Sequence, residues 1–179
     1  HQLSRGLGDV YKRQITLTGA LNTLRQHGIT GNDVYLVDFF PLIEMVWADG
    51  QAQQGEIDIL NNHIKKHVEH VNKLAGCNVL NHEDAEKFVM RFIEEKPDPE
   101  IMTTLTGLVN PIRLSTSNKK ENEKIKDSIL CLCMDIAAIA TTMYPYGSDE
   151  RFDSDEKKCF FRILEDLSSS DTPQASPFV

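Results

Sequence analysis

The chain has 179 residues, of which 40% are hydrophobic and 26% are charged, a composition typical of a globular protein with one substantial core. Its formal net charge of −8 at pH 7 argues against a nucleic-acid-binding surface, which needs a basic face. The longest apolar tract, residues 129–140, is interrupted by Asp135 and is shorter than the roughly 20 residues needed to span a bilayer.

The first 14 residues differ in character from the rest. The chain begins with His1 instead of methionine, and residues 4–14 read SRGLGDVYKRQ, which resembles an in-frame translation of a sequencing-library adapter. We therefore expect residues 1–14 to be a non-native, disordered scar outside the folded domain. A signal peptide, a membrane anchor or a further domain upstream is compatible with this interpretation.

Hydrophobic periodicity predicts an all-α fold. Apolar residues recur at helical spacing beside suitable caps, and no stretch sustains the two-residue alternation of a strand. Seven helices are expected, at residues 18–27, 32–49, 54–75, 81–93, 98–110, 121–142 and 153–167. Pro41 predicts a kink or a new start within the second helix, and Gly76 a stop after the third. One domain over residues 15–167 follows, with a disordered tail at 168–179, which is rich in Ser and Pro.

Two sets of side chains are expected in the core. The third helix should bury the stripe Ile57, Leu60, Ile64, Val68, Val71 and Leu74. The four cysteines, Cys77, Cys131, Cys133 and Cys159, contain no Cys-x-x-Cys pair, so buried thiols in a reducing compartment are favoured over disulfides. This cysteine usage favours a cytoplasmic location.

The most informative motif is acidic. An apolar helix runs into Ala48-Asp49-Gly50, and Glu56 then opens the next amphipathic helix. Asp149 and Glu156 repeat the spacing of Asp49 and Glu56 one hundred residues later. This pattern resembles the repeated signature of the TerB-like tellurite-resistance family. In the second copy Glu150 replaces the glycine, which departs from the family pattern.

The resemblance implies both an architecture and a role. The implied fold is a single compact seven-helix domain in which residues 33–76 and 121–167 form two pseudo-repeated helix pairs. The implied role is in stress response, including tellurite resistance, with acidic loops that chelate a metal and with protein partners, often near the membrane. Related domains also occur on membrane-anchored DnaJ-like co-chaperones, which makes a metal-free interaction scaffold the alternative.

Four carboxylates could form the metal site: Asp49, Glu56, Asp149 and Glu156. Hard oxygen ligands suit a divalent ion, with Ca²⁺ among the candidates, although carbonyls and water would have to complete its shell. The first loop is not an EF-hand, since Met45 and Trp47 stand where acidic ligands should. The competing interpretation is that these acids cap helices, because a carboxylate in a first helical turn is stabilised without any metal.

Three histidines form a second candidate metal site. His63, His67 and His70 follow one another at spacings of four and three, which places them on one face of the third helix. Imidazoles one turn apart are common Zn²⁺ ligands, yet no His-Glu-x-x-His motif accompanies them. Simple packing at the flank of the helix is the favoured interpretation.

No catalytic motif is evident. The chain has no glycine-rich phosphate loop and no Gly-x-Ser-x-Gly, and nothing in it selects a small-molecule substrate. We therefore expect a cytoplasmic, non-enzymatic module that binds a divalent metal and acts through protein partners, without nucleic acid. An unassigned small hydrolase ranks third, after the metal-free scaffold.

Overall fold

The computed structural model describes residues 16–142 and 154–168, and within these ranges all regular structure is helical. The elements are α2 (Leu17–Gln26), the 3₁₀ helix η1 (Gly31–Leu36), α3 (Phe39–Trp47), α4 (Gln54–Ala75), α5 (His82–Glu94), α6 (Pro99–Gly107), α7 (Val109–Arg113), α8 (Lys119–Thr142) and α9 (Ser154–Ser168). The all-α expectation is confirmed. The expected scar lies outside the described residues, and so does the expected tail except for Ser168, which ends α9.

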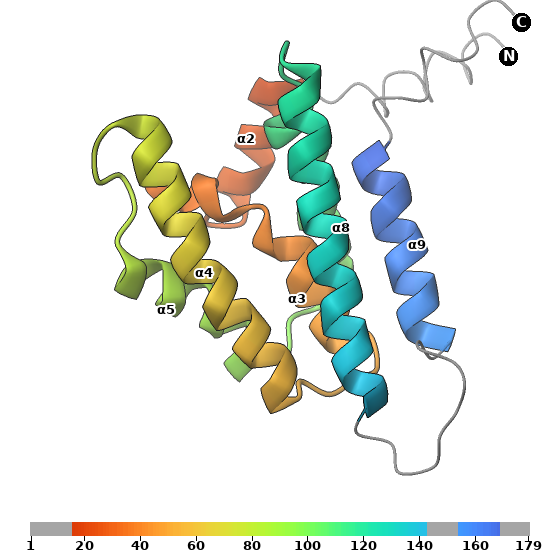
Figure 1. Ribbon diagram of the computed structural model, residues 1–179. Helices are drawn as coiled ribbons and strands as arrows, with labels where there is room; N and C mark the ends of the chain where they lie inside the picture. The colour runs from red at the N-terminus through yellow and green to blue at the C-terminus, as the bar shows by residue number, and fades with distance from the viewer. Residues whose placement is uncertain (1–15, 143–153, 169–179) are drawn as a thin grey trace, which may run out of the picture.

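Helix α3 lies at the centre of the fold. Its sequence, FFPLIEMVW, is apolar nearly all round, which is typical of a helix with protein on every side. It contacts α4, α5, α6, α8 and α9, and Figure 1 shows it behind α8 and enclosed by the longer helices. Within α3, only Glu44 and Trp47 are partly exposed, and the other residues are buried. The helix therefore packs against α4 and α9, whose first turns carry Glu56 and Glu156.

The count of seven helices is not confirmed, because two of the expected helices are divided. Residues 32–49 form η1 and then α3, and Pro41 lies in the first turn of α3, where its missing N–H leaves no hydrogen bond unmade. Residues 98–110 divide at Leu108, after which α7 begins with Val109. Eight α-helices result in the described part of the chain.

Helix α4 buries most of the expected stripe, with Ile57 partly buried against the core and Leu74 exposed. Leu60, Ile64, Val68 and Val71 belong to the core, whereas the side chain of Leu74 is 70% exposed. The prediction for Leu74 is wrong because α4 ends one residue later, beyond the helices that cover it. The left-handed Gly76 caps this end as expected.

The two segments that carry the acidic motif pack together. Helix α8 contacts both α3 and α4, and α9 contacts α3 and α8. Figure 1 shows α8 and α9 side by side, with α4 on the other side of α8. Helix α4 approaches α8 so closely that a β-carbon on Gly55 would lie 2.7 Å from Cγ2 of Ile139. The N-terminal turn of α4 is therefore held tightly against the second half of the domain.

No helix within the described ranges is long and apolar enough to cross a membrane.

Candidate functional site

Glu56 is a buried carboxyl group in the first turn of α4. Only 1% of the residue is exposed, and its Oε1 accepts a hydrogen bond of 3.0 Å from the backbone N–H of Gln53. Gln53 is extended and precedes the helix, so this contact is the reciprocal half of a capping box. The helix-capping interpretation of Glu56 is thus correct locally, but a capping residue does not need to be buried, as Glu56 is.

Asp49 lies in the turn that joins α3 to α4. Its side chain is partly exposed, and Oδ1 accepts a hydrogen bond of 3.1 Å from the N–H of Gln51. Gly50 has a φ of 88°, a conformation that glycine adopts without strain, and it allows the chain to reverse here. This turn brings the carboxylate of Asp49 close enough to raise the pKa of Glu56.

Glu156 provides a second buried carboxyl group, from the first turn of α9. It is 3% exposed, and its charge also raises the pKa of Glu56. Glu56 and Glu156 are one hundred residues apart in sequence, yet the packing of α4, α8 and α9 brings them within electrostatic reach of each other. The structure thus joins three of the four predicted acids, while Asp149 lies outside the described residues.

Burial dominates the electrostatics of this acidic cluster, which we define as Asp49, Glu56 and Glu156. Loss of solvent raises the pKa of Glu56 to about 8, the hydrogen bond from Gln53 opposes this shift, and the two neighbouring carboxylates reinforce it. At neutral pH the empty cluster therefore holds a proton on Glu56. Within residues 16–142 and 154–168, no three His, Cys, Asp or Glu side chains are already arranged as a metal-binding group.

The three histidines of the predicted metal site differ in their exposure along α4. His67 is buried and its Nε2 lies 2.6 Å from the carbonyl oxygen of Tyr35, while His70 is exposed. His63 packs with its ring centroid 5.2 Å from that of Phe39 and 5.8 Å from that of His67. Burial and the nearby His67 lower the pKa of His63 to about 4, so its ring is neutral at pH 7. These contacts are those of packed aromatic side chains.

Two buried ion pairs escaped the sequence analysis. Asp38 accepts a hydrogen bond of 3.0 Å from Nε of Arg113, which joins the start of α3 to the end of α7. Glu44 pairs with Arg162, whose other Nη donates to Asp166 across 2.8 Å. The sequence contained one signal that could have predicted the second pair. Glu44 is the only acid in the apolar sequence FFPLIEMVW, and a buried charge needs a partner.

The cysteines correct another expectation. Cys133 is buried and Cys159 partly so, and burial raises the pKa of both thiols, that of Cys159 to about 12. Cys77 and Cys131 are exposed, so the prediction of buried thiols is wrong for these two. Cys77 follows the end of α4, and Cys131 lies on the outer side of α8, two residues before the buried Cys133.

Comparison with known proteins gives no identification: no family model matches the chain, and neither a curated protein nor a solved structure is significantly similar to it. The TerB-like resemblance remains a prediction from the motif.

Proposed function

We propose that this protein is a non-enzymatic, TerB-like helical module that binds a divalent cation at the acidic cluster and acts through protein partners. The observation that carries the proposal is the burial of two carboxyl groups, Glu56 and Glu156, from segments one hundred residues apart. The role in stress response and tellurite resistance, the cytoplasmic location and membrane-associated partners follow from the family resemblance.

Buried carboxyl groups need compensation for the solvent that they lose. A carboxylate removed from water is strongly destabilising unless it takes up a proton, meets a cation or accepts several hydrogen bonds. Two buried acids beside Asp49 supply hard oxygen ligands from two segments, which is a donor set suited to Ca²⁺ or Mg²⁺. Asp149, at the same spacing in the second segment, is proposed as the fourth ligand, with carbonyl oxygens and water completing the shell.

The direct test is thermal unfolding with and without Ca²⁺, Mg²⁺ and Zn²⁺. An ion at a hundredfold excess over its dissociation constant should stabilise the folded state by about 2.7 kcal/mol, and the unfolding midpoint should rise accordingly. The double variant D49N/E56Q should lose this response. Glu69→Gln removes an exposed carboxylate from the same helix and should respond like the parent chain. If no ion moves the midpoint, the proposal fails.

A metal-free interaction scaffold is the second candidate. It is favoured by the capping hydrogen bond between Gln53 and Glu56, and by a pKa of about 8, with which a proton alone neutralises Glu56 at pH 7. In this case Asp49 only closes its turn through the N–H of Gln51, and Glu156 is a first-turn acid of α9. An unfolding midpoint that none of the three ions changes, but that rises in E56Q because the amide is buried without taking up a proton, would favour this alternative.

A further inference from the structure

The outer face of α9 carries an exposed stripe that the cation site does not use. Ser154, Lys158, Phe161 and Glu165 are all exposed, and the side chain of Phe161 is 62% exposed. The face opposite carries Glu156, Ile163 and Leu167, which are buried. The stripe therefore lies on the other side of the helix from the acidic cluster.

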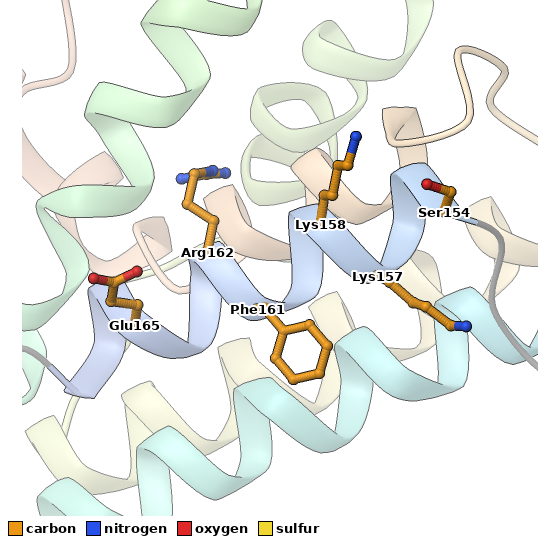
Figure 2. A pocket seen from close by; sticks show the side chains of 6 residues that line it. All are labelled: Ser154, Lys157, Lys158, Phe161, Arg162 and Glu165. Carbon is orange, nitrogen blue, oxygen red and sulfur yellow. The ribbon is translucent and has the colours of Figure 1, made fainter.

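The stripe borders a shallow groove of about 560 Å³. Its lining is Ser154, Lys157, Lys158, Phe161, Arg162 and Glu165. Figure 2 shows these six side chains on α9, with the ring of Phe161 projecting away from the helix. A large aromatic side chain gains about 1.5–3 kcal/mol when it is fully buried, so an exposed phenylalanine beside a groove favours a docking surface.

The spacing of the stripe places its side chains on one face of α9. Intervals of four, three and four residues separate Ser154, Lys158, Phe161 and Glu165, and Ser168 continues the series after three more. Alternating intervals of three and four keep side chains on one line along a helix, so these residues can all face one partner. Phe161 lies near the middle of the stripe, with Lys158 three residues before it, Glu165 four residues after it and a serine seven residues away on each side.

We propose that a second copy of this chain docks on this face, with the two α9 helices antiparallel and their Phe161 rings in contact. A twofold axis through Phe161 places Lys158 of each copy opposite Glu165 of the other. Ser154 then lies opposite Ser168. The contact is isologous, and its two ion pairs are formed by the same two residues of each chain.

The charges on the stripe favour a second copy of this chain over a partner of one charge sign. Lys158 and Glu165 form no ion pair with any side chain in the described part of the chain, and they lie on either side of Phe161. A purely acidic partner would face Glu165, and a purely basic one would face Lys158, each with like charges opposed. An antiparallel second copy satisfies both residues at once.

The contact is small, and the dimer is correspondingly weak. A single pair of 15-residue helices gives an interface at or below the roughly 1,200 Å² of transient complexes. Each chain also carries a net charge of −8, so the copies repel at long range. We therefore expect a monomer–dimer equilibrium in the micromolar range, which depends on protein concentration.

The experiment is sedimentation velocity of the full chain over a wide concentration range. Lys158→Glu opposes two carboxylates at each pair, and E165K opposes two ammonium groups, so each single variant should weaken the dimer at least tenfold. Mixing the two variants in equal amounts should restore dimers, because both ion pairs of a mixed dimer join opposite charges. One pair joins the original Lys158 and Glu165. The other pair joins the two substituted side chains, whose charges are exchanged. The double variant K158E/E165K should dimerise on its own, since both of its pairs have exchanged but opposite charges.

The control is Lys65→Glu, the same charge change at an exposed position on α4, which should leave the association unchanged. Circular dichroism checks that every variant keeps its helices. A parent chain that stays monomeric up to millimolar concentration overturns the proposal. So does a dimer that K65E weakens as much as K158E, or one that the mixture of single variants fails to restore.

Discussion

Glu56 and His63 are the side chains on α4 whose pKa values depart furthest from their ordinary range. The two shifts make the free energy of unfolding depend on pH in opposite directions. The pKa of Glu56 rises to about 8 because burial and the nearby Asp49 and Glu156 disfavour its charge. The pKa of His63 falls to about 4 because burial and the nearby His67 disfavour its charge as well. Both groups are neutral at pH 7, so neither leaves an unpaired buried charge in the metal-free protein.

Glu56 should make the metal-free protein less stable as pH rises. Between pH 4.5 and about 8 the folded state keeps a proton that the unfolded chain has released, so the free energy of unfolding decreases across this window. Glu56→Gln mimics the protonated group and should remove this slope. The gain at pH 8 should be about 1–3 kcal/mol, by urea unfolding.

The exposed variant E69Q is the control for this pH series and should follow the parent chain. A parent chain whose unfolding free energy stays flat from pH 5 to pH 8 would show that Glu56 is charged in the folded state without any cation.

His63 should act in the opposite direction, at acidic pH. Between about pH 4 and 6.5 the unfolded chain binds a proton that the folded state excludes, so stability is lost as pH falls through this window. Replacement of His63 by Gln should reduce the loss of unfolding free energy between pH 6.5 and pH 4.5 by about 1–2 kcal/mol, by urea unfolding. The exposed His70→Gln serves as the comparison. Equal acid sensitivity in both variants would contradict the buried, neutral state of His63.

At the scale of helices, local capping chemistry was predictable from sequence. Asn81 and Asp98 each accept two backbone hydrogen bonds at the starts of the helices predicted at 81–93 and 98–110, and Gly76 ends α4. Pro41 predicted the new start within the second helix, but the 3₁₀ form of η1 and the division at Leu108 were not predictable. They depend on how η1 and α7 pack against other helices, and residue periodicity contains no record of that packing.

The approach of α4 to α8 yields a prediction at the same scale. Gly55→Ala would place a β-carbon 2.7 Å from the branched Ile139, so α4 must shift and stability should fall by about 1–3 kcal/mol. The shift would also move Glu56, the next residue, and should weaken cation binding.

Gly107→Ala is the matched control for this substitution. Gly107 ends α6 with nothing within 4 Å of an added β-carbon, so alanine should be neutral or stabilise by about 0.5–1 kcal/mol. Thermal unfolding compares the two variants. Equal stability of G55A and G107A would mean that α4 and α8 do not need their close contact.

For the whole molecule, the sequence predicted the class of fold and the convergence of two acidic segments, but not the interior that joins them. The apolar pattern of α3 predicted burial, whereas the partners of Asp38 and Glu44 lie on distant helices that sequence spacing cannot relate. Likewise the equal spacing of Asp49–Glu56 and Asp149–Glu156 suggested one site. Only packing of α4, α8 and α9 brings Glu56 near Glu156.

We propose above that the acidic cluster binds a divalent cation. The most direct test is calorimetric titration of Ca²⁺ and Mg²⁺ at pH 7, in two buffers of different ionisation enthalpy. Because the pKa of Glu56 is about 8, binding must displace its proton, and the two buffers should report release of about one proton for each ion bound. The variant E56Q should lose both the binding and the proton release. Titrations without heat of binding for either ion, or an E56Q variant that binds as tightly as the parent chain, would contradict the account.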